Sequence, residues 1–249
     1  SLQGILFFPK QTGRADWEKG EIKLYCNQVF VSDSIKEVVP RYLLPLRGIL
    51  DSPDIPLNVS RSALQTDRRV RSIGQFVSKK VADKLRDLKK DNPNQYAEAW
   101  DALAPFVKIG AMEDDKFSEQ VSDLILFQTT AKIEENEDLL EGNGRTYTTI
   151  SSYRTRQTSE SQKRILYCTD EIAQAGALSL WKSQGAEVLF AETVLDSQFI
   201  PWLESKEHEL TFQRVDSELD SSLQDDQPEI SDQEGETKSE SLRTLIKKA

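Results

Sequence analysis

Arg61 is the residue in this sequence whose type and position most clearly suggest a chemical role. It lies in RYLLPLRGILDSPDIPLNVSRSALQ, where it follows an apolar stretch typical of a strand and precedes a long helical pattern. An arginine offers a planar fork of donors, and the first backbone N–H groups of a helix also attract negative charge. Both features favour a phosphate, so Arg61 could stabilise a phosphoryl transfer on a nucleotide that is held elsewhere.

A purely structural interpretation of the same residues is also open. Ser62 and Gln65 have the S-x-x-Q spacing of a capping box. In that case they satisfy the first N–H groups of the following helix, and Arg61 is a solvated surface charge.

The charge of the chain is distributed unevenly. The net charge is -10, and ten acidic residues with only one base lie between positions 216 and 240. Thirteen bases and six acids lie between positions 36 and 90, so this stretch could face an anion. Its arginine triplet at 68–71 does not indicate nucleic acid, because the pI is about 4.8 and the same helix has Phe76 as its only aromatic.

Several enzyme classes are disfavoured by the motifs. The sequence has no phosphate-binding GK[ST] loop, no GxGxxG and no HExxH. His208 is the only histidine, and Cys26 and Cys168 are too far apart in sequence for a CxxC pair, so triads and zinc sites are improbable. A self-contained hydrolase is therefore the least favoured function, and we expect no bound metal.

The elements that would position Arg61 form an α/β lobe with a helical extension, expected over residues 1–130. Strands are predicted in ILFFP and IKLYCNQVFVS, and the polar loop between them carries Trp17, which either contacts a partner or folds back over the sheet. A short helix interrupted near its prolines is expected over residues 32–52.

A long amphipathic helix is predicted next. Its apolar positions recur at spacings of three and four, and they are Val70, Ile73, Val77, Val81, Leu85 and Leu88. DNPNQ ends this helix. Two further helices are expected, in YAEAWDALAPFVKIG and around FSEQVSDLILFQTT.

The remainder of the chain is expected to form a second, smaller lobe. Residues 131–163 are mostly polar and indicate a connection between lobes. Residues 164–215 contain RILYCT, a helix ending at Gly185, and AEVLFAE, which together predict a βαβ unit. Residues 216–249 are expected to be an acidic linker, disordered to about Glu240.

The predicted fold class is therefore mixed α/β (α+β), with a larger three-layer α/β/α lobe, a helical connector, a smaller α/β/α lobe and the acidic linker. No stretch approaches the roughly 18 apolar residues of a membrane span, so a soluble, unexported protein is expected.

The sequence resembles the middle domain of the ninety-kilodalton heat-shock chaperone family, in its bacterial HtpG branch. The resemblance covers roughly residues 3–215. It rests on ILFFPK, IKLYCNQVFVSD, VPRYLLPLRGILDSPDIPLNVSRSALQ, KIGAMEDD and YCTDEI.

The resemblance implies a role for the loop that contains Arg61. In that family the arginine of the SR pair reaches the terminal phosphate of ATP, and a glutamine assists; these are Arg61 and Gln65 here, with Asn58 and Ser60 in the same catalytic loop. The family also places an exposed aromatic that contacts clients in the loop after its first strand, where Trp17 lies.

The resemblance further implies an ATP-driven, Mg-dependent, homodimeric chaperone of the cytoplasm. Its partners would be an amino-terminal nucleotide domain, a carboxy-terminal dimerisation domain, unfolded client proteins and co-chaperones. This chain alone is then expected to bind no ATP tightly and to be largely monomeric.

The sequence departs from the family pattern at three positions. Ser62 replaces a frequent acidic residue, and Asn27 and Gln28 replace two frequent bases, so charge-based roles there do not carry over. The main alternative function is a non-catalytic α/β scaffold that joins protein partners and has Arg61 on its surface.

Overall fold

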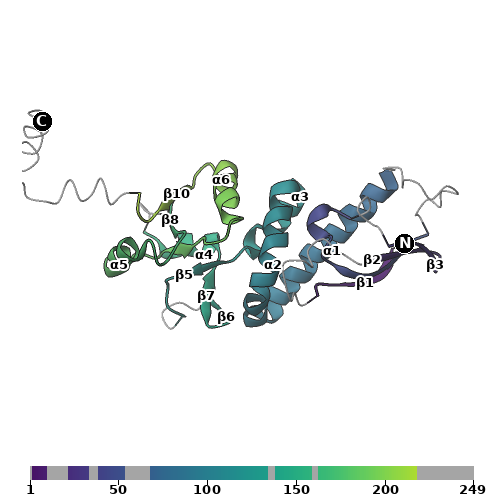
Figure 1. The fold of residues 1–249 in the computed structure, drawn as a ribbon, viewed down its shortest axis with the longest axis horizontal. Coiled ribbons are helices and arrows are strands. Elements are labelled where there is room, and N and C mark those ends of the chain that lie inside the picture. Colours follow the sequence, from purple (N-terminus) through teal and green to yellow (C-terminus); the bar gives the residue numbers. More distant parts are fainter. Residues whose placement is uncertain are drawn as a thin grey trace, which may run out of the picture.

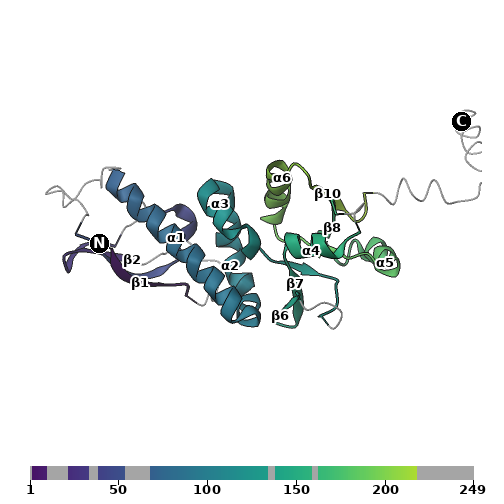
Figure 2. The same cartoon turned by 180° about the vertical axis from the view of Figure 1, so that it is seen from behind.

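The computed structural model describes residues 2–9, 22–33, 39–53, 68–133, 138–158 and 162–217. It is elongated, with one sheet near each end and the helices α1, α2 and α3 between the two sheets (Figure 1). The same helices lie between the sheets when the molecule is seen from behind (Figure 2).

The first sheet has four strands in the order β1-β4-β2-β3. They are β1 (Gln3–Phe7), β2 (Ile22–Cys26), β3 (Val29–Ser32) and β4 (Arg47–Asp51). β2 and β4 are parallel, whereas β1 pairs with β4, and β3 with β2, in antiparallel fashion. Gly48 allows β1 to approach β4 closely, because its φ is +143° and a Cβ there would lie 1.9 Å from the Ile5 carbonyl oxygen.

The short helix expected at 32–52 differs from the structure in its described part. A 3₁₀ turn, η2 (Arg41–Leu43), is followed directly by the strand β4. Prolines at both sides of this turn limit helix growth, and the branched residues Ile49 and Leu50 pair with β1 instead.

The long helix is present as α1 (Arg68–Asp91), and its predicted stripe packs inward: Ile73, Val77 and Leu85 are buried. α2 (Pro93–Glu113) begins one residue later with Pro93 in its first turn, where no N–H is required. α3 (Asp115–Val121) and a 3₁₀ turn, η3 (Ser122–Leu124), follow.

The predicted third helix is too long at its carboxyl end. α3 stops at Val121, and the residues that follow η3 form a strand, β5 (Phe127–Thr129). This apolar run is buried in the second sheet, where β5 pairs with strands on both of its sides. A short apolar run does not distinguish a buried strand from a buried helix by its periodicity.

The second sheet has six strands in the order β10-β8-β9-β5-β7-β6. Besides β5 they are β6 (Leu140–Gly142), β7 (Arg145–Thr148), β8 (Arg164–Cys168), β9 (Leu189–Phe190) and β10 (Thr211–Arg214). Its helices are α4 (Ile150–Arg156), α5 (Ala175–Ser183) and α6 (Asp196–Lys206). β8 and β9 are parallel with α5 between them in sequence, which is the βαβ unit read from the sequence.

Alternate residues of β8 pack into different clusters on the two faces of this sheet. Ile165 belongs to the main core with Phe199 of α6, whereas Leu166 packs with Leu178 of α5. The sheet is therefore covered on both faces, which gives the smaller unit three layers. The mixed α/β fold class is confirmed.

The segment 131–163, expected as a connection between lobes, contains β6, β7 and α4 in its described part. The two strands form a hairpin at the edge of the second sheet. Their mostly polar composition follows from this edge position, since Glu141 and Arg145 face solvent while Tyr147 is buried. Where one lobe ends and the next begins stays a prediction.

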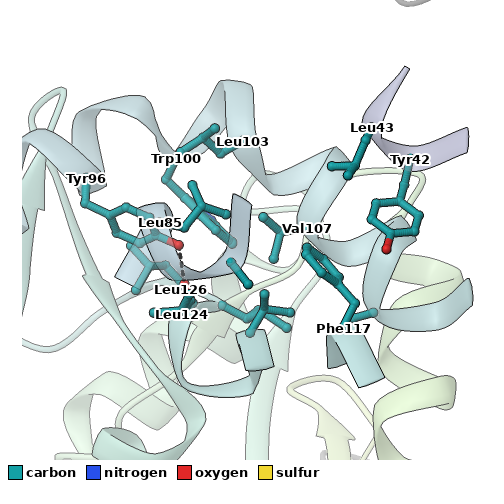
Figure 3. Packing of buried hydrophobic residues seen from close by; sticks show 14 of the residues in the cluster. Tyr42, Leu43, Leu85, Tyr96, Trp100, Leu103, Val107, Phe117, Leu124 and Leu126 are labelled. Carbon is teal, nitrogen blue, oxygen red and sulfur yellow. Dashed lines mark hydrogen bonds between the residues drawn. The ribbon is translucent and has the colours of Figure 1, made fainter. Parts of the chain in front are cut away.

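The main core joins both sheets through α2. Figure 3 shows Tyr96, Trp100, Leu103 and Val107 of α2 among side chains from α1, α3 and the η3 turn. The Tyr96 hydroxyl donates a buried hydrogen bond to the Leu124 carbonyl at 2.8 Å. Within the described residues, no helix is long and apolar enough to cross a membrane.

Candidate functional site

The residues predicted to act on ATP lie outside the described residues. Arg61, Gln65, Asn58 and Ser60 all fall within 54–67, and Trp17 falls within 10–21. The described residues show what holds the two ends of the segment 54–67. Its first end follows β4, and its second end leads into α1.

The first end is fixed by hydrogen bonds to the neighbouring strand. The Ser52 N–H donates to the Tyr25 carbonyl at 3.0 Å, and Ser52 is buried. The Asp51 carboxylate accepts the Gln28 N–H through Oδ2 at 2.9 Å, whereas its Oδ1 is buried and has no hydrogen-bond partner among the described residues. β4 therefore ends at a defined position beside the turn between β2 and β3.

That turn contains Asn27 and Gln28, two of the three positions at which the sequence departs from the family pattern it resembles. Asn27 and Gln28 have φ values of 49° and 67°, as the two-residue turn of a type I′ hairpin requires. Glutamine rarely adopts this left-handed conformation. The bond from its N–H to Asp51 stabilises the turn, so the two polar residues have a structural role without the charge of two bases.

The second end is held through α1. The Tyr42 hydroxyl, which comes from η2, lies 3.0 Å from Ser78 Oγ on α1 and 3.2 Å from Asp114 Oδ2. Its proton can be donated to either oxygen, because Ser78 donates its own proton to the Gly74 carbonyl. Burial, with the nearby Asp114 carboxylate, raises the pKa of Tyr42, so the hydroxyl stays protonated.

Asp114 also connects this network to α3. Its Oδ1 accepts the N–H groups of Lys116 and Phe117, as an N-cap residue does. Tyr42 packs on the Phe117 ring with centroids 4.8 Å apart, and Figure 3 shows the two rings side by side. The network connects η2, α1 and α3 into one support.

Two bases of the stretch 36–90 stabilise the fold by hydrogen bonds to backbone carbonyl groups. Arg86 of α1 donates to the Gln120 carbonyl, and Lys89 donates to the Asp123 carbonyl. Burial lowers the pKa of Lys89. Both bases thus bond carbonyl groups at the end of α3 and in η3, while Lys79, Lys80 and Lys84 are exposed.

The described residues hold no arrangement for nucleophilic or metal catalysis. His208 is exposed in the turn before β10, and Cys26 and Cys168 are buried free thiols. Burial raises the pKa of Cys168, which disfavours the reactive thiolate. No group of three or more possible metal ligands occurs among the residues that the structure describes.

The sequence analysis missed Asp51, which holds the chain shortly before the segment 54–67, and Asp114, which belongs to the network at Ser78 of α1. A usable signal existed for Asp114, since an aspartate followed by a helical pattern is a common N-cap. Asp51 gave no such signal, because its contact with Gln28 joins residues 23 positions apart.

Comparison with known proteins identifies the family. The Hsp90 protein family matches residues 1–249. The chaperone protein HtpG of Porphyromonas gingivalis is 37% identical over 228 residues, which cover 90% of this chain and 31% of that protein. HtpG of Bacteroides fragilis is 36% identical over 251 residues, which cover 99% of this chain and 35% of that protein. The chain thus spans about a third of the length of these curated relatives.

A solved structure has the same fold. The middle domain of a Plasmodium falciparum heat shock protein superposes with a TM-score of 0.64 at 23% identity, covering 87% of this chain and 83% of that one. Taken with the match of the whole chain, this places the chain in the Hsp90 family, as a middle domain of the HtpG type.

Proposed function

We propose that this chain completes the ATPase of an HtpG-type chaperone by supplying Arg61 to the terminal phosphate of ATP. The nucleotide and its Mg²⁺ would be held by a separate amino-terminal domain. Gln65 would assist Arg61, and Asn58 and Ser60 would shape the same loop. The single observation that carries the proposal is the SRSALQ motif at the entrance to α1, in a chain of this family.

The described residues support this role because they fix both ends of the segment 54–67. Asp51 and Ser52 hold its start on the first sheet, and the Tyr42 network holds α1 at its end. An arginine on a segment with fixed ends can be presented to a phosphate on another domain with little additional ordering. Arginines supplied in this way stabilise the charge of the transition state.

The experiment measures ATP turnover and ATP affinity in the full-length protein. Arg61→Ala is expected to lower turnover at least tenfold while nucleotide affinity changes little, because the contact forms mainly in the transition state. Arginine fingers elsewhere contribute about 10³ to 10⁵, but slow domain closure can hide part of this effect. Gln65→Ala should lower turnover in the same direction.

Arg41→Ala is the matched control, because Arg41 is an exposed arginine on η2. Its turnover should equal that of the parent. Unchanged turnover in a folded Arg61→Ala protein would refute the proposed role and favour the non-catalytic scaffold. Mixing this chain with the isolated nucleotide domain tests the same point, since the chain alone should neither hydrolyse ATP nor bind it tightly.

We also propose that clients contact the outer face of the first sheet and the segment with Trp17. Ile5 and Phe7 of β1 are 76% and 53% exposed, and Ile49, paired with Ile5, is 48% exposed. Beside β1 lies an apolar groove of about 560 Å³, lined in part by Leu6, Phe8 and Leu46. Apolar surface of this kind suits unfolded segments.

A test of this surface measures suppression of aggregation of an unfolding client protein. Trp17→Ala and Ile5→Ser should weaken suppression, whereas Ile172→Ser, at a 91% exposed position near α5, should not. The assay is run on this chain and on the full-length protein. An effect of Ile5→Ser in the chain but not in the full-length protein would mean that another part of the protein covers this face, and would refute client contact there.

The assembly and location of the full-length protein follow from the family and are part of the proposal. We infer a cytoplasmic homodimer whose dimer contacts lie in a carboxy-terminal domain, with co-chaperones among its partners. Sedimentation of this chain at micromolar concentration should show a monomer; a tight dimer would contradict the assignment of dimerisation to another domain.

A further inference from the structure

A buried ion pair joins α2 to the second sheet. Lys108 lies on α2, and its ammonium is 2.5 Å from Asp196 Oδ1 at the start of α6. Their side chains are only 7% and 4% exposed. The charges are thus nearly fully removed from water, which is costly unless each is compensated.

The ammonium is compensated by groups from two elements of the second sheet. It lies 4.9 Å from the centre of the Phe127 ring of β5 and 5.4 Å from that of Phe199 on α6. Both contacts are within cation–π range. Lys108 is therefore surrounded by one carboxylate and two aromatic faces that do not belong to its own helix.

Asp196 has a divided role. Its Oδ1 faces Lys108, whereas its Oδ2 accepts the backbone N–H of Thr193 at 3.0 Å and the Thr193 hydroxyl at 2.7 Å. The carboxylate thus fixes the turn between β9 and α6 at the same time as it fixes α6 on α2.

A second attachment of the sheet to α2 lies on the other side of Pro105. Gly142 of the β6–β7 hairpin lies against the α2 backbone at Ala97, and the Asn143 side chain donates to the Glu98 carbonyl at 2.8 Å. Pro105 lies inside the continuous helix between the two attachments, and it has no N–H to donate to the carbonyl four residues earlier. A helix bends more easily at such a point.

We propose that the Lys108–Asp196 pair is a conformational lock that fixes α6, and with it the second sheet, at one position on α2. Apolar contacts alone can be satisfied in several neighbouring positions, whereas a buried ion pair is satisfied in only one. The hairpin fixes the amino-terminal half of α2, and the lock fixes the half after Pro105. The two sheets therefore keep a constant relative orientation.

The test compares three variants of this chain: Lys108→Met, Asp196→Asn and the apolar pair Lys108→Met/Asp196→Leu. Each single variant leaves one buried polar group without its partner, and we expect its thermal midpoint to fall by about 10 °C. The apolar pair leaves no buried charge and should recover most of the midpoint, except for the part contributed by the Thr193 hydrogen bonds to Asp196. A Thr193→Val variant loses the hydroxyl bond but keeps the ion pair, so it measures that part separately. Amide hydrogen exchange of α6 is measured on the same proteins.

The lock predicts that α6 exchanges at least tenfold faster in the apolar pair than in the parent and in Thr193→Val, although most of the midpoint is recovered. Lys206→Met is the matched control, because Lys206 of α6 pairs with Asp115 of the neighbouring helix α3 at 2.6 Å but is exposed. Its exchange should equal that of the parent. Parent-like exchange of α6 in the apolar pair would overturn the lock, and so would single variants with unchanged midpoint and exchange.

Discussion

The Gly142→Ala substitution tests how closely the β6–β7 hairpin packs on α2. A Cβ at this position would lie 2.5 Å from the Ala97 carbonyl carbon and 2.5 Å from the Glu98 nitrogen. Ordinary contacts are near 3.5 Å, so the hairpin would have to move by about 1 Å. Both contacted atoms belong to helix backbone and cannot turn aside as a side chain can.

Two effects set how much the Gly142→Ala substitution lowers the free energy of unfolding. Overpacking against a fixed backbone typically costs about 1–3 kcal/mol. A shifted hairpin also strains the bond from Asn143 to the Glu98 carbonyl, which contributes about 1 kcal/mol. The free energy of unfolding should therefore fall by about 2–4 kcal/mol, which corresponds to roughly 5–15 °C in the thermal midpoint of a chain of this size.

Substitutions of two other glycines serve as controls that distinguish this steric clash from the effects of a glycine-to-alanine change on the backbone. Gly144 has a φ of +71° and no neighbour within 4 Å of an added Cβ, so Gly144→Ala should cost only about 1 kcal/mol of left-handed strain. Gly176 lies in α5 with open space around it, and Gly176→Ala should be neutral or stabilise by up to about 1 kcal/mol.

The assay is urea unfolding of the three variants and the parent, followed by circular dichroism and by Trp fluorescence. The expected order of stability is Gly176→Ala highest, then the parent, Gly144→Ala and Gly142→Ala. A Gly142→Ala protein no less stable than Gly144→Ala would refute the close packing of the hairpin on α2.

Three further outcomes are expected. Asp114→Ala should lose about 1–2 kcal/mol by removing the α3 cap, whereas the exposed Asp115→Ala should not, and calorimetry of both checks this. Burial raises the pKa of Tyr153 from 10 to about 12, so its contribution to stability is complete below pH 10 and lost as pH rises towards 12. The difference between the ultraviolet titrations of the parent and Tyr153→Phe isolates this residue, and ionisation near pH 10 in that difference would contradict the prediction. Cys26 and Cys168 should react with a thiol reagent only in denaturant, and rapid native labelling would disprove their burial.

The sequence was most informative where one face of an element is buried along its whole length. The α1 stripe could be predicted because Ile73, Val77 and Leu85 share a helix face and pack inward. The βαβ unit was readable because β8 and β9 are apolar on both faces and Gly185 follows α5 with a φ of +75°.

The hairpin at the sheet edge was missed because its strands are short and only partly buried. Its signal was the Asn143-Gly144 pair, whose φ values of 53° and 71° fit a type I′ turn. Read with the buried Tyr147 and Thr148, that pair predicts two antiparallel strands within the segment that looked like a connector.

Arg61 could be singled out from the sequence, because it lies in the family motif. The groups that hold the chain on either side of the segment 54–67 could not be predicted in this way. Asp51 reaches Gln28, and Tyr42 reaches Ser78 and Asp114, through contacts that only the folded chain brings together. The proposed site therefore rests on a motif, whereas the contacts at the residues on either side of the segment 54–67 are long-range pairs that the sequence does not show.

Lys108 shows how far such a pair can be anticipated. In FVKIGA it is a single charge within a run whose neighbours Val107, Gly110 and Ala111 are buried. A buried ammonium needs a compensating partner, so this pattern alone predicts that an acidic side chain lies nearby. It does not identify Asp196, which lies 88 positions later at the first turn of α6, in a segment with its own acidic neighbours Glu187 and Glu192. The choice among these three carboxylates is made by the position of α6 on α2, so the ion pair is a result of the fold that then restricts it.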